Sequence, residues 1–347
     1  MLTLIYFVLI LGVIVLVHEF GHFIFSKLFG VYVHEFSIGM GPAIFQRQGK
    51  NKETTYSLRA IPIGGYCALA GEDDEMDKDV PKDRCLQNKP IWQRFIIMVA
   101  GAMNNFILAV IILLLIATLV GAPNLDPIIG SVETGGPAEQ AGLEAGDRVT
   151  RINNDKVSTT DDLAIFLQLA DMSKPVTFYV TKEDGTETTY EVTPIAEEVD
   201  GTTTYRIGVT IDNEVRHDVL SVLSYTARKT GSLFKQMIIS FQALFTGRVG
   251  FDQLSGPVGI YQIVGAQSET GLANMFYLVA LLSVNVGFLN LLPIPAMDGG
   301  RIFLLLIELI KRKPVKPETE NLVNTVGFIL LLALMLLVTI NDVVKLF

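Results

Sequence analysis

Apolar residues along this chain gather in four long runs that are separated by much more polar segments. Each run is close to the roughly 20 residues that an α-helix needs to cross a hydrocarbon core about 30 Å thick. The runs cover residues 2–25, 96–120, 274–292 and 322–340, and the third contains Asn285 and Asn290. This pattern predicts a multi-pass α-helical membrane protein with about four transmembrane helices.

The polar stretch between the second and third runs carries the alternation of a small soluble α+β domain. Strand patterns occur at 128–133, 176–180 and 188–193, and a helical stretch occurs at 160–170. The segment PAEQAGLEAGDRVTRIN (137–153) resembles the helix, turn and strand of a PDZ domain. PDZ domains bind extended chain ends by adding a strand to a sheet edge. A folded spacer without a ligand is the alternative.

Two further segments have patterns of their own. Residues 217–246 place apolar side chains at helical spacing, which predicts one or two amphipathic helices that lie on the outer membrane surface or pack on the soluble domain. Residues 54–71 mix β-branched and aromatic residues with Pro and Gly, which favours a β-hairpin.

These patterns divide the chain into four parts. Residues 1–120 hold two transmembrane helices with a loop and the hairpin, and 121–212 form the PDZ-like domain. Residues 213–272 hold amphipathic helices on the outer membrane face, and 273–347 hold the last two transmembrane helices.

Composition and charge agree with a membrane location. Half of the 347 residues are hydrophobic, and the mean hydropathy of +0.43 is high for a soluble protein. The formal charge of −9 gives no indication of nucleic-acid binding. The first run lacks a preceding basic residue and a small-residue cleavage site, so we expect it to stay in the mature protein.

Basic residues near the spans predict the topology, because cytoplasmic loops are enriched in Lys and Arg. They follow the first span, precede the second, and separate the third from the fourth: Lys27, Arg47, Lys50, Lys52, Arg59, Lys89, Arg94, Lys311, Arg312, Lys313 and Lys316. Both termini and residues 121–272 should therefore face outward. Cys67 and Cys85 fall in a cytoplasmic loop, where reduced thiols are expected. The acidic run 72–79 is interpreted as a solvated loop without chemistry.

The first apolar run contains the sequence HEFGH at 18–22. Residues i and i+4 share a helix face, so His18 and His22 can bind one metal ion while Glu19 deprotonates a water molecule beside it. Ionisable groups within an apolar span are costly and need partners or a polar cavity. The pattern therefore predicts a zinc hydrolase site within the membrane.

Catalytic zinc usually has three protein ligands, and Asp298 is the candidate for the third. It follows Pro293 and Pro295, which cannot continue a helix, and irregular backbone at membrane depth requires a protein or water-filled surrounding. Asp298 could also be the N-cap of a helix at 300–311. The first and third spans run in the same direction, so Asp298 should lie near the cytoplasmic side with His18 and His22.

These motifs together resemble the site-2 protease family of intramembrane zinc metalloproteases, in the bacterial branch that includes the regulator of sigma-E protease. The resemblance covers nearly the whole chain, but with one PDZ domain instead of two. It rests on HEFGH, AGAMNNF (100–106), NLLPIPAMDGG (290–300), FSIGMGP (36–42) and LSGPVGI (254–260).

The resemblance implies a set of residue roles. His18, His22 and Asp298 would bind Zn²⁺, and Glu19 would be the catalytic acid/base. Substrate binding would fall to Asn290, Asn105, Gly64 and Gly65. The two glycines belong to the hairpin at 54–71, which would be a membrane-associated β-hairpin that holds unwound substrate by strand addition. The PDZ-like domain would screen substrate ectodomains from the outer side of a bacterial cytoplasmic membrane.

The expected reaction is cleavage of transmembrane segments in membrane proteins such as anti-sigma factors or signal-peptide remnants. Zinc would activate a water molecule, and Glu19 would take its proton and pass it to the leaving amine. Two other functions stay open at this point: a catalytically inactive PDZ scaffold, and an ion transporter that uses the intramembrane His and Asp.

Overall fold

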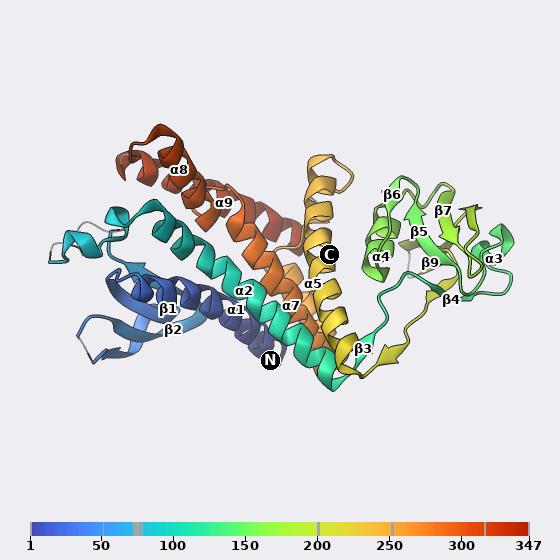
Figure 1. Ribbon diagram of the computed structural model, residues 1–347, viewed down its shortest axis with the longest axis horizontal. Coiled ribbons are helices and arrows are strands. Elements are labelled where there is room, and N and C mark those ends of the chain that lie inside the picture. The colour runs from blue at the N-terminus through green and yellow to red at the C-terminus, as the bar shows by residue number, and fades with distance from the viewer. Residues whose placement is uncertain are drawn as a thin grey trace. The chain divides into compact units, whose positions relative to one another are not determined.

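The computed structural model describes residues 2–50, 52–71, 77, 79–199, 202–250, 253–315 and 317–345. The chain forms two compact units (Figure 1). Unit 1 comprises Met1–Ile112 and Asp252–Phe347, and unit 2 comprises Leu113–Phe251. The acidic run expected to be a solvated loop lies outside the described residues, except for Asp77 and Asp79.

Within the described residues, four helices are long and apolar enough to cross a membrane, as the sequence predicted. They are α1 (Leu2–Leu28), α2 (Ile91–Leu119), α7 (Leu272–Leu291) and α9 (Pro317–Val344). The helix α9 begins earlier than its apolar run because Pro317 and the acidic Glu318 and Glu320 suit a helix N-terminus. The chain is therefore a multi-pass membrane protein.

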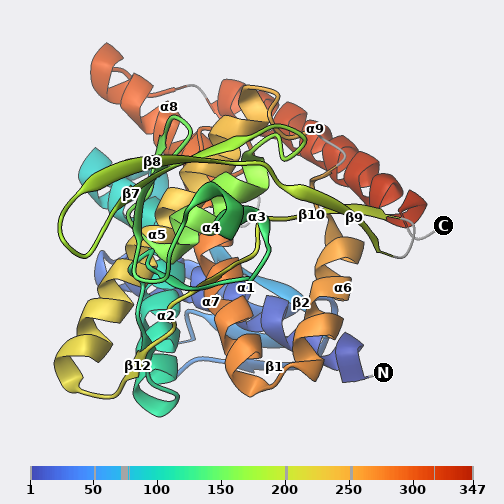
Figure 2. The ribbon, with the colours of Figure 1, turned by 90° about the vertical axis from the view of Figure 1, so that its right-hand side faces the viewer.

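The helices of unit 1 pack around the N-terminal half of α1. A buried cluster joins Ile10 and Ile14 of α1 to Val264 of α6 (Pro257–Glu269) and to Met275 and Leu278 of α7. Figure 2 shows α6 and α7 side by side. Further along, α1 and α2 lie so close that a Cβ on Gly21 would overlap the Ala100 carbonyl group.

A buried carboxylate joins α6 to α9. Asp342 is 4% exposed, and its Oδ2 accepts hydrogen bonds from the backbone N–H groups of Gly256 (2.9 Å) and Gly259 (2.8 Å). N–H groups at the start of a helix have no acceptor within the helix itself, so Asp342 of α9 caps α6 from outside.

Residues 54–71 are β structure, but they do not pair with one another as the predicted hairpin requires. Strand β2 (Thr55–Leu69) pairs antiparallel with β1 (Val33–Gln48). Residues 35–38 of β1 have partners on both sides, at 65–68 and at 55–58, while 65–69 pair on one side only. The pairing register shifts between Ile38 and Ala43, where Gly39 and Gly41 have positive φ, so residues 54–71 contribute two strand segments to the sheet and do not form a hairpin by themselves.

This sheet lies against α1 (Figure 1). A second buried cluster joins it to α2 and to α8 (Asp298–Lys311) through Val33, Leu69, Ile97, Met98 and Leu305. Two short 3-10 helices, η1 (Lys82–Arg84) and η2 (Leu86–Asn88), connect the sheet to α2. The β strands are therefore fixed next to the helices that carry the candidate site.

Unit 2 contains an α+β domain. Its main sheet has the order β6-β5-β7-β8, and its helices are α3 (Pro137–Ala141) and α4 (Thr160–Leu169). The strands of this sheet are β5 (Arg148–Ile152), β6 (Asp155–Lys156), β7 (Val176–Thr181) and β8 (Glu187–Val192). Gly142 ends α3 in the left-handed conformation at φ 94°, so the helix, turn and strand occur in the expected order.

Shorter strands complete this unit. They pair as β4 (Ile129–Val132) with β11 (Val209–Ile211), β9 (Ile195–Val199) with β10 (Thr202–Arg206), and β3 (Ala122–Pro123) with β12 (Val215–Arg216). The hydrophobic core lies between the sheets and α4, around Phe178, which is fully buried.

The expected amphipathic segment is a single helix, α5 (Val219–Phe245). One side packs on the rest of unit 2, where Val222 contacts the cluster around Ala117 and Ala122. The Lys229 amine, 8% exposed as a residue, lies 2.7 and 2.9 Å from the two oxygens of Asp161 on α4. Leu220 and Leu223 remain exposed.

Removing one partner of this buried pair should destabilise unit 2. Asp161→Ala removes the carboxylate that lies against the buried Lys229 amine, and loss of one member of a buried pair typically costs about 3–5 kcal/mol of unfolding free energy. Hydrogen exchange of the α4 and α5 amides in the detergent-solubilised chain measures the effect. Asp171→Ala, which breaks an exposed pair with Lys174, should leave exchange unchanged. Equal exchange in both variants would contradict the assignment.

Candidate metal centre

Helix α1 places its two histidines on one buried face. His18 and His22 are 6% and 7% exposed, and their Nε2 atoms lie 3.2 Å apart. The i, i+4 spacing produces this proximity, since such residues lie one turn apart on the same side of a helix. The HEFGH motif therefore presents two imidazole nitrogens toward one point.

Helix α2 supports both imidazoles from behind. His22 Nδ1 lies 2.8 Å from the Ile97 carbonyl oxygen, which fixes the proton on Nδ1 and leaves the Nε2 lone pair for a ligand. His18 Nδ1 lies 3.4 Å from the side-chain amide of Asn105, which is fully buried. Gly101 lies between these two contacts, where a Cβ would come within 2.8 Å of His18 Nε2 and closer still to His22.

The proline-containing loop after α7 brings Asp298 to the histidines. Helix α7 ends before Leu292, Ala296 has φ 69°, and Asp298 is the first residue of α8. The N-cap is Met297, without a side-chain hydrogen bond, so the alternative of Asp298 as the N-cap is wrong. A Cβ on Gly299 would overlap the carbonyl groups of Leu291 and Leu292, so glycine allows this tight return.

The three side chains converge on one small volume. Asp298 Oδ2 lies 3.1 Å from His18 Nε2 and 3.2 Å from His22 Nε2. This oxygen is buried and has no hydrogen-bond partner. A tetrahedral zinc ion with bonds of about 2.0–2.1 Å holds its ligands about 3.3 Å apart. The spacing, the unpartnered oxygen and the donor set of two imidazoles and one carboxylate all fit zinc.

Glu19 lies beside this cluster and is oriented by the sheet. Its carboxylate accepts a hydrogen bond from the backbone N–H of Cys67 in β2. Glu19 also lines a cavity of about 550 Å³ together with His18, His22 and Asp298. A carboxylate in this position can exchange a proton with a molecule in the cavity.

Of the four expected substrate-binding residues, all of them in the described part of the chain, only one lines the cavity. Asn290 lines the cavity, and its Nδ2 donates to the Val286 carbonyl group (2.9 Å). Asn105, Gly64 and Gly65 are not among the described residues that line it. The two glycines lie in β2, just before the cavity-lining Tyr66 and Cys67.

Several residues that line the cavity were not predicted from the sequence. Tyr66 and Cys67 come from β2, Arg301 comes from α8, and Asn324 and Thr325 come from α9. For Asn324 and Thr325, the sequence feature that could have indicated a place at the cavity is their polarity near the start of an apolar run. Tyr66 donates to Glu35 Oε2 (2.6 Å), and burial and this hydrogen bond raise the pKa of Tyr66 to about 12. Its hydroxyl therefore stays protonated at neutral pH.

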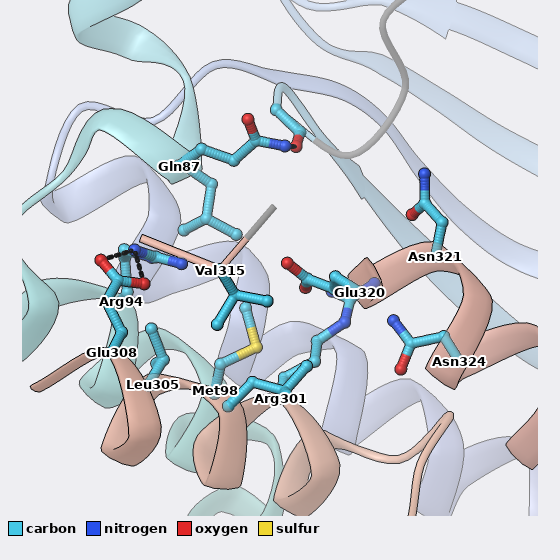
Figure 3. Close-up of a pocket in the computed structure, with 13 residues that line it drawn as sticks. Gln87, Arg94, Met98, Arg301, Leu305, Glu308, Val315, Glu320, Asn321 and Asn324 are labelled. Carbon is cyan, nitrogen blue, oxygen red and sulfur yellow. Dashed lines mark hydrogen bonds and ion pairs between the residues drawn. The ribbon is translucent and has the colours of Figure 1, made fainter. Parts of the chain in front are cut away.

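A second, polar cavity of about 270 Å³ adjoins the first (Figure 3). The two cavities share Met98, Arg301 and Asn324. One wall is an ion pair in which Arg94 Nη1 lies 3.0–3.1 Å from both oxygens of Glu308, and Figure 3 shows this pair at the side of the pocket. The pair fixes the start of α2 against α8 and so supports the position of Asp298.

Comparison with known proteins identifies relatives over the full length. Residues 6–334 match the profile of peptidase family M50. The zinc metalloprotease RasP of Bacillus licheniformis is 32% identical over 99% of both chains. The regulator of sigma-W protease RasP of Bacillus subtilis is also 32% identical over 99% of both. A putative zinc metalloprotease of Clostridium perfringens is 38% identical over 98% of both.

Gly101 provides a test of the geometry. Gly101→Ala should displace both imidazoles and abolish zinc binding, because the new methyl group would occupy the space beside the two Nε2 atoms. Zinc content of the purified protein measures this. Gly231→Ala in α5 makes the same change where no atom lies within 4 Å and should keep full zinc content. Normal zinc content in Gly101→Ala would contradict the structure of the site.

Proposed function

The chain belongs to peptidase family M50 and is an intramembrane zinc metalloprotease, and we propose that His18, His22 and Asp298 bind its zinc ion and Glu19 is its catalytic acid/base. The observation that carries this proposal is the convergence of three buried donor atoms within 3.2 Å of one another. The scaffold and transporter functions are not favoured, because the relatives are proteases and all four residues lie at one cavity.

Each residue has a defined part in peptide hydrolysis. Bound zinc supplies a Lewis acid that lowers the pKa of water and polarises the scissile carbonyl group. Glu19 takes the proton of the attacking water and then gives it to the leaving amine. The Cys67 N–H holds the Glu19 carboxylate in place, and His22 is held by the Ile97 carbonyl group.

The substrate is the transmembrane segment of another membrane protein, and we propose that it is cleaved in an extended conformation. A helical peptide bond is inaccessible because its amide groups are hydrogen-bonded within the helix and enclosed by side chains. Residues 65–69 of β2 pair with β1 on one side only, and Tyr66 and Cys67 line the cavity. Addition of a substrate strand here would replace hydrogen bonds lost on unwinding. Gly64 and Gly65 would admit the substrate backbone, and Asn290 would contact it.

The distribution of basic residues supports a proposal for the membrane orientation. We propose a bacterial cytoplasmic membrane, with the metal centre near the cytoplasmic side and unit 2 on the outer side. There the PDZ-like domain would screen substrate ectodomains, and the exposed Leu220 and Leu223 of α5 would contact lipid headgroups. The name of the Bacillus subtilis relative refers to regulation of a sigma factor, which makes an anti-sigma factor a suitable first substrate to test.

Glu19→Gln separates metal binding from chemistry. The amide keeps the shape of the side chain but cannot accept a proton, so cleavage of a model transmembrane substrate should fall about 10²–10⁴-fold while zinc content is unchanged. Glu318→Gln, an exposed position at the start of α9, should retain full activity. Full activity in Glu19→Gln would exclude the proposed mechanism.

The two native cysteines allow a test of the extended substrate. In a Glu19→Gln background treated with a mild thiol oxidant, single cysteines placed at successive substrate positions should form disulfides with Cys67 at every second position, because side chains alternate along a strand. Cys67→Ala should abolish these cross-links and Cys85→Ala should not, since Cys85 does not line the cavity. A repeat of three to four positions would show that the bound substrate is helical.

A further inference from the structure

We propose that Asn105 is a positioning residue for the metal ligand His18, and that its side-chain oxygen accepts a hydrogen bond from His18 Nδ1–H. This inference rests on the proposed zinc site. It gives Asn105 a role in metal binding, in place of the contact with substrate that the sequence suggested.

The location of Asn105 favours a role behind the site. Its side chain is completely buried, its Nδ2 atom as placed lies 3.4 Å from His18 Nδ1, and it does not line the catalytic cavity. Ser283 of α7 donates to the Asn105 carbonyl oxygen (2.8 Å), which fixes the backbone of α2 at this point. Asn105 therefore contacts the ligand and is closed off from the cavity that receives substrate.

The hydrogen-bond inventory determines which amide atom faces the imidazole. A neutral His that binds metal through Nε2 carries its proton on Nδ1 and needs an acceptor there. Two donors would face each other if the Asn105 NH₂ group also pointed at Nδ1. The Oδ1 atom of Asn105 is buried without a partner, and a half-turn of the amide exchanges Oδ1 with Nδ2. The metal-bound state thus requires the oxygen on His18.

The proposed hydrogen bond at His18 Nδ1 parallels the hydrogen bond at His22 Nδ1. His22 Nδ1 lies 2.8 Å from the Ile97 carbonyl oxygen, and Ile97, Gly101 and Asn105 follow one another at intervals of four on α2. They therefore form one stripe, with an acceptor at each end and a glycine where the imidazoles come closest. A backbone carbonyl group accepts the hydrogen bond from His22 Nδ1–H, and we assign the equivalent acceptor for His18 to the Asn105 side chain.

The experiment measures zinc affinity of the detergent-solubilised full chain by competition with a chelating indicator, together with the visible spectrum of the Co²⁺-loaded protein. Asn105→Leu removes the acceptor at similar volume and should weaken zinc binding about 10–100-fold, as loss of a partner behind a ligand does. It should also change the Co²⁺ spectrum. Asn105→Asp keeps an acceptor oxygen and should restore affinity to within about threefold of wild type.

Asn104→Leu is the matched control. Asn104 neighbours Asn105 on α2 and donates to the Val17 carbonyl group of α1 (3.2 Å) but does not contact an imidazole, so its replacement should leave zinc affinity and the Co²⁺ spectrum unchanged. Wild-type affinity in Asn105→Leu, or an equal loss in Asn105→Leu and Asn105→Asp, would overturn the inference. Wild-type affinity in His18→Ala would instead overturn the zinc site on which it rests.

Discussion

The rest of this structure depends on the need to hold ionisable side chains inside an apolar helix bundle. A charged group at the centre of a bilayer costs about 2.5–3.5 kcal/mol on insertion scales, and a buried polar atom without a partner is costly as well. Here the carboxylate of Asp298 faces two imidazole nitrogens, and each imidazole has a partner on α2. A bound metal ion would complete the coordination of all three side chains.

Close approach of backbones makes this arrangement possible. Gly21 lets α1 and α2 come together, and Gly101 leaves room for the imidazoles. Gly299 lets the start of α8 lie against the carbonyl groups at the end of α7. The irregular backbone after α7 ends at the cavity, which Ala296 and Met297 line, and a cavity is where such backbone is tolerated at membrane depth. The same glycines that look unremarkable in an apolar sequence therefore set the dimensions of the site.

The hydrophobic periodicity and the positions of the charged residues were sufficient to predict the helices and the residues they bring together. The four long helices, the shared face of His18 and His22, and the arrival of Asp298 at the same place follow from helix geometry and from charge asymmetry. The pairing of 33–48 with 55–69 could not be read in this way, because strand partners are set by tertiary packing. Likewise, Tyr66 and Asn324 reach the cavity only through the folding of distant segments. Asp298 was open to interpretation as an N-cap, because side chains such as Asp are common both at helix starts and as metal ligands.

We propose that two imidazoles and one carboxylate hold the zinc ion and that Cys67, which lines the same cavity, does not bind it. X-ray absorption spectroscopy of the zinc-loaded protein tests this directly, because zinc–nitrogen and zinc–oxygen distances of about 2.0–2.2 Å are distinct from a zinc–sulfur distance of about 2.3 Å. We expect only nitrogen and oxygen atoms bonded to zinc, together with the outer-shell scattering of two imidazole rings. A sulfur ligand, or the scattering of fewer than two imidazoles, would contradict it.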